Sequence, residues 1–353
     1  MTLGGVVGNV RPADRGAKRA ARQRQQRLTK PPGSLGRLED LSVQLAGIFE
    51  TDRPTVQGIT VIVAAADHGV VAQGVTGYPQ AVTAQMVLNF LAGGAAINVM
   101  ARTRGADLVI VDAGVSAPLP QHPDLRVVAP GRGTRDFTQG PAMTREQAEA
   151  CLRAGADLAA AASERGAAII GTGDMGIGNT TSASAITAAV TGASPGRTTG
   201  RGTGRTDPEL AHKTACVERA LDVNQPDPAD GLDVLTKVGG FEIGVLAGVV
   251  LGGALARRAV VLDGFVSGAA ALIANCLCPT VHDYLIAGHL SVEPGHRIAL
   301  EHMKLHPLLD LGMRLGEGTG ALLAAGVVEV AAACLSDMAT FDEAGVSDRE
   351  PAH

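Results

Sequence analysis

The residues with the most suggestive chemistry lie in one glycine-rich stretch, GTGDMGIGNTTSASAI, at positions 171–186. An apolar run, GAAII, precedes this stretch, and the residues after it predict a helix with Asn179 or Thr180 as its N-cap. A strand, a glycine turn and a helix N-terminus bring unpaired backbone N–H groups and the positive end of the helix dipole together. This arrangement is suited to an anion, although a tight strand–helix connection that binds nothing would have the same pattern.

A second glycine-rich segment, GASPGRTTGRGTGRTD, occupies residues 192–207. Its composition is typical of a flexible linker. The GRGTG within it, with Arg201, Arg205 and the downstream Lys213, could also hold a phosphate through N–H groups, a hydroxyl and positive charge. Neither glycine loop contains the Gly-Lys-Ser/Thr of a P-loop, and AADHGVVAQG, after the first expected strand, lacks the dinucleotide fingerprint.

A third segment, LGEGTGALLAA at residues 315–325, places Glu317 between glycines and beside Leu315, just before a helix expected to begin near Thr319. A carboxylate in an apolar pocket has a raised pKa and accepts a proton better near neutral pH. A surface turn would also accommodate this glutamate. The three glycines nevertheless lose much backbone entropy on ordering, which indicates that the backbone must approach something closely.

The elements that must position these residues alternate along the chain. Strands are expected at 59–67, 107–114, 167–174, 258–264 and 284–290, with a further extended segment at 308–315, and helices at 80–103, 144–165, 208–223 and 242–256. This pattern predicts an α/β protein with a mainly parallel, Rossmann-like sheet and helices on both faces. Ligands of such sheets bind at the carboxyl ends of the strands, where several of these runs end in polar or glycine-rich clusters such as Asp67-His68-Gly69 and Asp263-Gly264.

The chain termini predict a smaller helical part. A basic segment is expected to form a solvated helix over Arg15–Leu28, and apolar spacing at Leu38, Leu41, Leu45 and Ile48 predicts a second helix. We therefore expect an N-terminal helical segment at 1–55, an α/β domain at 56–340 and a flexible C-terminus at 341–353.

Composition narrows the class of protein. Of 353 residues, 46% are hydrophobic and only 2% aromatic, so the core must be built from Ala, Val, Leu and Ile. The net charge of −5 disfavours nucleic acid as a partner. Five scattered cysteines do not suggest a disulfide framework, and CLC at 276–278 has no second ligand pair with zinc spacing. With no signal peptide and no long uninterrupted apolar run, we expect a soluble, cytoplasmic protein without a membrane partner.

Several long blocks together resemble the nicotinate-nucleotide–dimethylbenzimidazole phosphoribosyltransferase family of the cobalamin pathway. They run in order from about residue 30 to residue 340. The blocks are KPPGSLGRLE (30–39), ADHGVVAQGVTGYPQAVTAQMVLNFLAGGAAIN (66–98), DAGV (112–115), the 171–186 stretch, GRGTG (200–204), GGFEIGVLAGVVLGGA (239–254), VLDGFVSGAAAL (261–272), HLSVEPGH (289–296) and LLDLGMRLGEGTGA (308–321).

The resemblance implies transfer of phosphoribose from nicotinate mononucleotide to 5,6-dimethylbenzimidazole, without metal or cofactor, by a homodimer. It implies Glu317 as general base. The phosphate and ribose would contact Gly173, Asp174, Met175, Gly176, Gly178, Asn179, Thr180, Gly202, Thr203, Gly204 and Lys213. The base would contact Pro79, Gln80, Gln85, Met86 and Leu315.

The sequence departs from the family pattern at two places. Asp174 stands where the family usually has Glu, which shortens the acid by one methylene, and Arg205-Thr206 replaces a more apolar or acidic pair. Two alternatives stay open: a phosphoribosyltransferase for another aromatic base, and a non-catalytic nucleotide-binding protein.

Overall fold

Across residues 2–202, 204 and 206–347, which the computed structural model describes, six parallel strands form one sheet. The strands are β1 (Ile59–Ala66), β2 (Asp107–Gly114), β3 (Leu125–Val127), β4 (Ile169–Met175), β5 (Ala259–Leu262) and β6 (Leu285–Ala287). Their order, β3-β2-β1-β4-β5-β6, is that of doubly wound Rossmann-like folds. The order reverses between β1 and β4, and a ligand site is expected outside the carboxyl ends of these two strands.

The central strands are hydrophobic because both faces of the sheet are covered. Every residue of β1 is buried, and β1 pairs with β2 on one side and with β4 on the other. A continuous apolar run of this kind is typical of a parallel sheet between two helical layers. The expected strands at 59–67, 107–114, 167–174, 258–264 and 284–290 are confirmed within a few residues at their ends.

Helices precede, separate and follow the strands along the chain. They are α1 (Leu3–Asn9), α2 (Arg15–Gln25), α3 (Arg37–Phe49), α4 (Ala81–Leu91), α5 (Ala96–Arg104), α6 (Arg145–Glu164), α7 (Asn179–Thr191), α8 (Pro195–Thr198), α9 (Asp207–Asn224), α10 (Gly231–Val238), α11 (Phe241–Leu255), α12 (Phe265–Leu277), α13 (Pro294–His302), α14 (Thr319–Asp337) and α15 (Phe341–Ala344). Short 3₁₀ turns lie at Gly69–Gln73 and Pro279–Tyr284.

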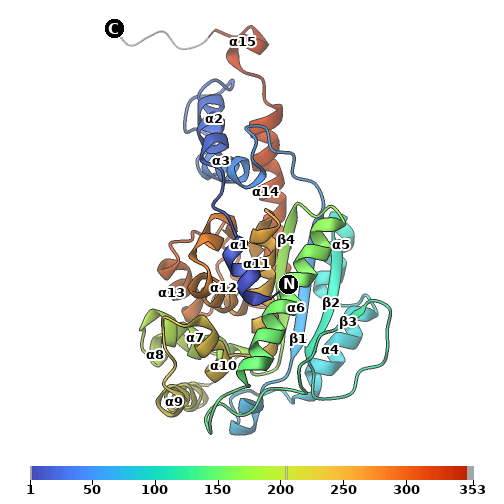
Figure 1. Cartoon of the computed structure of the whole chain (residues 1–353), viewed down its shortest axis with the longest axis vertical. Coiled ribbons are helices and arrows are strands. Elements are labelled where there is room, and N and C mark those ends of the chain that lie inside the picture. The colour runs from blue at the N-terminus through green and yellow to red at the C-terminus, as the bar shows by residue number, and fades with distance from the viewer. Residues whose placement is uncertain (1, 203, 205, 348–353) are drawn as a thin grey trace.

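Successive residues of β4 point to opposite faces of the sheet and show which helices cover each face. Thr172 donates a hydrogen bond to Ser267 of α12, whereas its neighbour Gly173 lies against the backbone of Glu317, just before α14. Helices α11 and α12 therefore cover one face, and α4, α5 and α14 cover the other. Figure 1 shows these layers around the sheet, with α6 packed outside α11.

Glycines allow α6 and α11 to pack backbone against backbone. A Cβ atom at Gly155 of α6 would lie 1.9 Å from the carbonyl oxygen of Val245, and one at Gly248 of α11 would lie 2.1 Å from that of Leu152. Neither position can accept a side chain without separating the helices. Helix α11 is thus packed between α6 on one side and strands β1 and β4 on the other.

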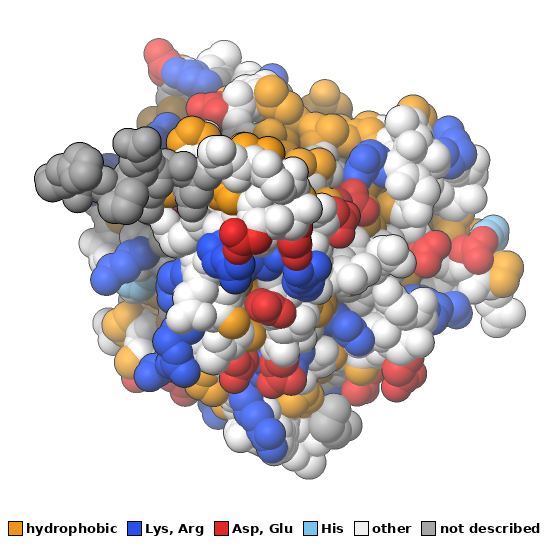
Figure 2. Space-filling model, turned by 90° about the horizontal axis from the view of Figure 1, so that it is seen from above, with side chains coloured by type: hydrophobic (Ala, Val, Ile, Leu, Met, Phe, Trp, Pro, Cys, Tyr) orange, Lys and Arg blue, Asp and Glu red, His pale blue; other side chains and the backbone are white. Residues whose placement is uncertain are grey.

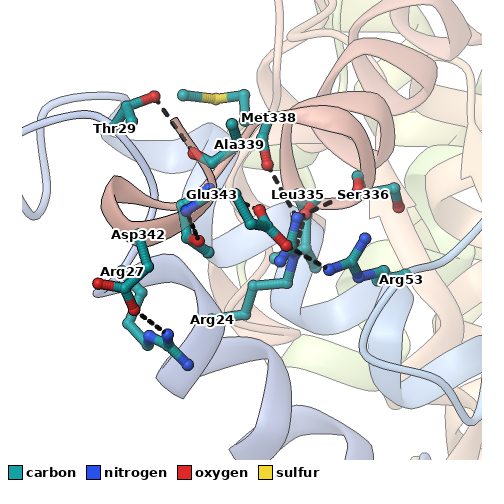
Figure 3. Close-up of polar contacts among 11 residues, drawn as sticks. Arg24, Arg27, Thr29, Arg53, Leu335, Ser336, Met338, Ala339, Asp342 and Glu343 are labelled. Carbon is teal, nitrogen blue, oxygen red and sulfur yellow. Dashed lines mark hydrogen bonds and ion pairs between the residues drawn. The ribbon is translucent and has the colours of Figure 1, made fainter. Parts of the chain in front are cut away.

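Helices α2 and α3 pack against α14 at the end of the molecule opposite α4 and α9, and α15 follows at the same end, whereas α1 packs on α6 and α11 (Figure 1). Buried Arg24 of α2 donates to the carbonyl oxygens of Leu335, Ser336 and Met338, and so caps the end of α14 (Figure 3). Residues 28 and 340 form a β-bridge beside this cap. The division of the chain at residues 55 and 340 stays a prediction.

Several basic residues of the N-terminal region form ion pairs with acidic residues far away in the sequence. Arg27 pairs with Asp342, Arg53 with Glu343 and Lys18 with Asp283. Figure 2, which views the molecule from this end, shows basic side chains interleaved with acidic ones, and hydrophobic side chains gathered along one side. Two of these ion pairs, from Arg27 and from Arg53, connect the N-terminal region to α15.

The structure corrects three details of the sequence prediction. The helix expected at 80–103 is two helices, because the chain turns at Gly93, where φ is +77°. The segment 308–315 forms no strand beyond one bridge from Leu309 to His289, since Pro307 lacks an N–H and Gly312 turns the chain at φ +65°. The sixth strand is instead β3, which has only three residues, too few for an alternating pattern to reveal it, and whose last two residues are exposed.

Two helical stretches have the length and apolar composition of a membrane span. The stretch 81–104 is divided by the turn between α4 and α5. The other, α14, packs on β1, β4 and β5 and against α3, so its apolar composition is that of a core helix.

Candidate active site

A cavity of about 490 Å³ opens at the carboxyl end of β4, beside the point where the strand order reverses, and extends past the carboxyl ends of β5 and β6. Its walls come from the residues after β4, β5 and β6, from the start of α4, from α9 and from the loop before α14. Segments far apart in the sequence thus meet there. Of the predicted strand-end clusters, the glycine-rich turn after β4 and Gly264 after β5 line the cavity, whereas Asp67, His68 and Gly69 do not.

The 171–186 stretch forms β4, a glycine turn and the N-terminus of α7. The N-cap is Gly178 in a left-handed conformation, φ +94°, so the expectation of Asn179 or Thr180 is wrong. A side chain at Gly178 would be strained there and would also lie 2.8 Å from Val71. Asn179 instead begins the helix and donates from its side chain to Asp174 Oδ2 at 2.9 Å.

Lys213 supplies a buried cation to this end of the cavity. Its side chain, on α9, is 2% exposed, and its Nζ donates to Thr180 Oγ1 at 2.8 Å and to the carbonyl oxygen of Gly200 at 3.2 Å. The ammonium group therefore lies beside the N-terminus of α7, and both features favour an anion. Glu293 accepts a hydrogen bond from the N–H of Gly202 at 2.9 Å and fixes the second glycine loop against this site.

Glu317 lies on the cavity wall with its backbone in the left-handed region, φ +64°. Its N–H donates to the carbonyl oxygen of Asp174 at 3.1 Å, and its Oε2 accepts from the N–H of Ile97 at 3.3 Å. The residue is only 4% exposed, which rules out the surface-turn alternative. Burial raises the pKa of Glu317, the negative charge of Asp263 adds to this shift, and the Ile97 N–H opposes it.

Asp174 faces the same cavity and is also deeply buried. Burial raises its pKa well above the ordinary value, and the negative charges of Asp263 and Glu242 add to the shift, while the Asn179 amide opposes it. A cationic ligand beside Asp174 would counter this shift and favour its carboxylate form. The cavity therefore combines an anion site at Lys213 with acids suited to a positive group.

Two buried histidine–carboxylate contacts lie behind the loops that follow β1, β5 and β6. His68, directly after β1, lies 2.7 Å from Glu242 of α11, and both side chains are fully buried. His289 Nε2, after β6, lies 3.5 Å from Asp263 Oδ1. Burial lowers the pKa of His296 to about 3, so this residue is neutral and accepts the N–H of Ser291.

Most of the residues predicted for the site line this one cavity. They are Met86, Asp174, Met175, Gly176, Gly178, Asn179, Thr180, Gly202, Lys213, Leu315 and Glu317. Pro79, Gln80 and Gln85 lie outside the cavity wall at the start of α4, with Pro79 and Gln85 exposed, and Gly204 is also exposed. Gly173 lies under the Glu317 loop, and Thr203 lies outside the described residues.

Other residues of the wall were not predicted. Tyr78, Val82 and Phe265 add apolar surface, and His289, Ser291, Glu293 and Arg314 add polar groups. The block HLSVEPGH, directly after the strand expected at 284–290, carried a signal for three of these polar residues. Among the residues that the structure describes, no group of three or more His, Cys, Asp or Glu side chains is arranged to hold a metal ion.

Comparison with known proteins gives consistent results. A family model described as phosphoribosyltransferase matches residues 10–346. Nicotinate-nucleotide–dimethylbenzimidazole phosphoribosyltransferase from Chloroflexus aggregans is 55% identical over 347 residues, and that from Roseiflexus sp. is 56% identical over 347 residues, with 98% of each chain covered in both cases.

Solved structures agree with the sequence relatives. The crystal structure of CobT from Thermus thermophilus matches this chain with a TM-score of 0.91 and 49% sequence identity. The match covers 94% of this chain and 99% of the CobT chain. A crystal structure of the nicotinate-nucleotide–dimethylbenzimidazole phosphoribosyltransferase from the same organism also has a TM-score of 0.91, at 47% identity over 95% of this chain.

Proposed function

The chain belongs to the nicotinate-nucleotide–dimethylbenzimidazole phosphoribosyltransferase family, and from this premise we propose that Glu317 is the general base of its reaction. The enzyme transfers the phosphoribosyl group of nicotinate mononucleotide to 5,6-dimethylbenzimidazole, and the products are α-ribazole 5′-phosphate and nicotinate. This reaction belongs to cobalamin biosynthesis.

We assign the 5′-phosphate to the N-terminus of α7. Lys213 Nζ and the hydroxyl of Thr180 lie 2.8 Å apart there, at the positive end of the helix dipole. Gly202 brings a second backbone segment to the same wall. This combination of a buried cation and a helix N-terminus supports a phosphate better than any other group of the substrates.

We assign the aromatic base to the apolar side of the cavity. Val82 and Met86 of α4 line it together with Tyr78 and Leu315. A flat, apolar bicyclic ring fits such a wall, and the ring nitrogens would then face Glu317. Gln80 and Gln85 lie outside the wall in this chain, so their proposed contacts require a shift of α4 and its N-cap.

Bond changes at the ribose follow from this assignment. The bond from C1′ to the pyridinium nitrogen breaks, and its electron pair neutralises the departing nicotinate ring. A ring nitrogen of dimethylbenzimidazole forms the new bond to C1′ from the opposite face, which converts the β-glycoside into an α-glycoside. The proton on the other ring nitrogen passes to Glu317, whose raised pKa makes it an effective acceptor near neutral pH.

We assign Asp174 to the positive charge that develops on the ribose. Its carboxyl group lines the cavity within hydrogen-bond distance of Asn179, and a bound pyridinium would favour its charged form. A fixed negative charge at that position stabilises the transition state more than the neutral product.

The observation that carries the general-base proposal is the position of Glu317, which is buried and yet on the wall of the cavity that Lys213 and Thr180 share. The transfer reaction is tested by a product assay, and the role of Glu317 by the Glu317→Gln variant in the same assay. Enzyme, nicotinate mononucleotide and 5,6-dimethylbenzimidazole should give nicotinate and the α-anomer of the ribotide in equal amounts, separated by chromatography.

The same assay distinguishes the alternatives. When a panel of aromatic bases is compared, faster turnover of another base than of dimethylbenzimidazole would show that dimethylbenzimidazole is not the preferred acceptor. Nucleotide binding without any release of nicotinate would leave a binding protein and contradict catalysis.

We further propose that the enzyme is a cytoplasmic homodimer. Val99 of α5, Leu88 of α4 and Val330 of α14 are apolar and exposed on the layer that covers one face of the sheet. Apolar side chains gathered on one surface favour contact with a second copy. Light scattering that gives the mass of a single chain at micromolar concentration would contradict the dimer.

A further inference from the structure

Asp263 connects β5 to the catalytic loop. Its side chain is fully buried at the carboxyl end of β5. Oδ2 accepts the N–H of Gly318 at 3.0 Å, and Oδ1 accepts those of Gly320 at 2.7 Å and Ala321 at 3.2 Å. These three N–H groups belong to the N-cap and first turn of α14, directly after Glu317.

The beginning of α14 cannot cap itself. The first N–H groups of a helix lack intrahelical acceptors, and the N-cap Gly318 has no side chain to supply one. Asp263 supplies both oxygens from another strand, and its negative charge lies at the positive end of the helix dipole. A cap that comes from a neighbouring strand fixes the helix start relative to the sheet as well as completing its hydrogen bonds.

Asp263 is itself held in place. Its N–H donates to Thr172 Oγ1 at 3.3 Å, and the same hydroxyl donates to Ser267 Oγ at 2.9 Å. On its other side, His289 Nε2 lies 3.5 Å from Oδ1. A Cβ at Gly320 would lie 1.9 Å from the His289 ring, so the helix start fits closely between this histidine and β4.

We propose that Asp263 is a positioning residue for Glu317, which fixes the direction of its carboxylate and adds negative charge beside it. Glu317 immediately precedes the three N–H groups that Asp263 binds, so any movement of that turn moves Glu317. Asp263 after β5 and the N–H of Ile97 from α5 act directly on Glu317, and the charges of Asp174 on β4 and Glu317 repel each other. His289, after β6, lines the same cavity and lies 3.5 Å from Asp263 Oδ1. This inference rests on the proposed role of Glu317 as general base.

The test is Asp263→Asn. The amide keeps the shape but offers one acceptor oxygen in place of two and carries no charge, so the turn should loosen. We expect kcat to fall roughly 10- to 100-fold, the usual cost of a misplaced catalytic group, while the affinity for nicotinate mononucleotide stays within about twofold. Removal of the charge should also lower the pKa of Glu317, so the acidic limb of the kcat profile should move to lower pH.

Asp230→Asn is the matched control. Asp230 also caps a helix start, because its Oδ1 accepts the N–H groups of Leu232 at 2.9 Å and Asp233 at 3.2 Å, but it lies outside the cavity wall. This variant should keep both kcat and the position of the acidic limb. If Asp263→Asn does not fold, Asp263→Glu keeps the charge and should lower kcat without moving the limb, and wild-type kcat in that variant would overturn the inference.

Glu317→Gln, measured in the same series, separates the two proposals. If Glu317→Gln turns over normally, the general-base assignment fails and the role of Asp263 fails with it. If Glu317→Gln is slow but Asp263→Asn keeps wild-type kcat, the inference alone is wrong. A lower kcat in Asp263→Asn with an unmoved acidic limb would show a purely structural cap and would also overturn it.

Discussion

Replacing Gly173 by alanine should damage catalysis although Gly173 does not line the cavity. A Cβ at this position would lie 2.6 Å from the carbonyl oxygen of Glu317, 2.7 Å from its carbonyl carbon and 2.7 Å from the nitrogen of Gly318. All three are backbone atoms, so no side chain can rotate away. Gly173 is therefore small because the backbone of the catalytic loop lies directly on β4.

The size of the effect follows from the displacement. Ordinary contact begins at 3.4 Å, so the Glu317 backbone must retreat by roughly 0.8 Å. A shift near 1 Å at a catalytic group costs on the order of 10²-fold in rate, and overpacking of this kind costs about 1–3 kcal/mol of stability. We expect kcat of Gly173→Ala to fall roughly 10- to 100-fold, with nucleotide affinity nearly unchanged because the site at Lys213 is not displaced.

Gly171→Ala is the matched control, since it lies on the same face of the same strand. Its Cβ would lie 3.2 Å from Val61 Cγ2 and 3.4 Å from Ala321 Cβ, contacts that a small side-chain movement relieves. Formation of the ribotide at saturating substrates should distinguish the two variants, with circular dichroism to verify folding. Equal kcat in folded Gly173→Ala and wild type would refute the close-packing argument.

Two further predictions concern binding and stability. Lys213→Ala should weaken the affinity for nicotinate mononucleotide more than it lowers kcat, because in the proposed assignment its charge faces a phosphate that is present in ground and transition state alike. An unchanged dissociation constant by calorimetry would remove Lys213 from the phosphate site. Arg24→Ala should lower the free energy of unfolding by about 2–4 kcal/mol, since three carbonyl oxygens at the end of α14 lose a buried charged donor. Arg27→Ala removes one exposed ion pair and should lower this free energy by at most about 1 kcal/mol. Equal melting temperatures of the two variants would contradict the role of Arg24 as a helix cap.

The sheet and the identity of the loops could be predicted because they depend on local pattern. Continuous apolar runs mark buried parallel strands, and glycine clusters after them mark the ligand edge. The position of Glu317 before α14 followed from the same logic, and its burial and raised pKa agree with the expectation of an apolar pocket.

The contacts between segments could not be predicted in this way. Nothing local to Asp263 shows that its carboxylate caps a helix more than fifty residues downstream, and nothing near His68 indicates Glu242 as its partner. The cap of α7 was assigned to Asn179 or Thr180 from residue preference, whereas the chain turns at Gly178, where only a glycine fits. Such features depend on how the strands are ordered in space.

The most direct test of the central claim compares Glu317→Gln with the wild type, with kcat and nucleotide affinity measured on the same preparations across pH. Glutamine keeps the size and the hydrogen-bonding shape but cannot take a proton. The wild-type kcat should rise with pH through a pKa above the ordinary glutamate value of 4.5, because the base must lose its proton first. In the variant this limb should vanish, kcat should fall by roughly 10²–10⁴, and nicotinate mononucleotide should still bind. Near-normal turnover of dimethylbenzimidazole by Glu317→Gln would contradict the account.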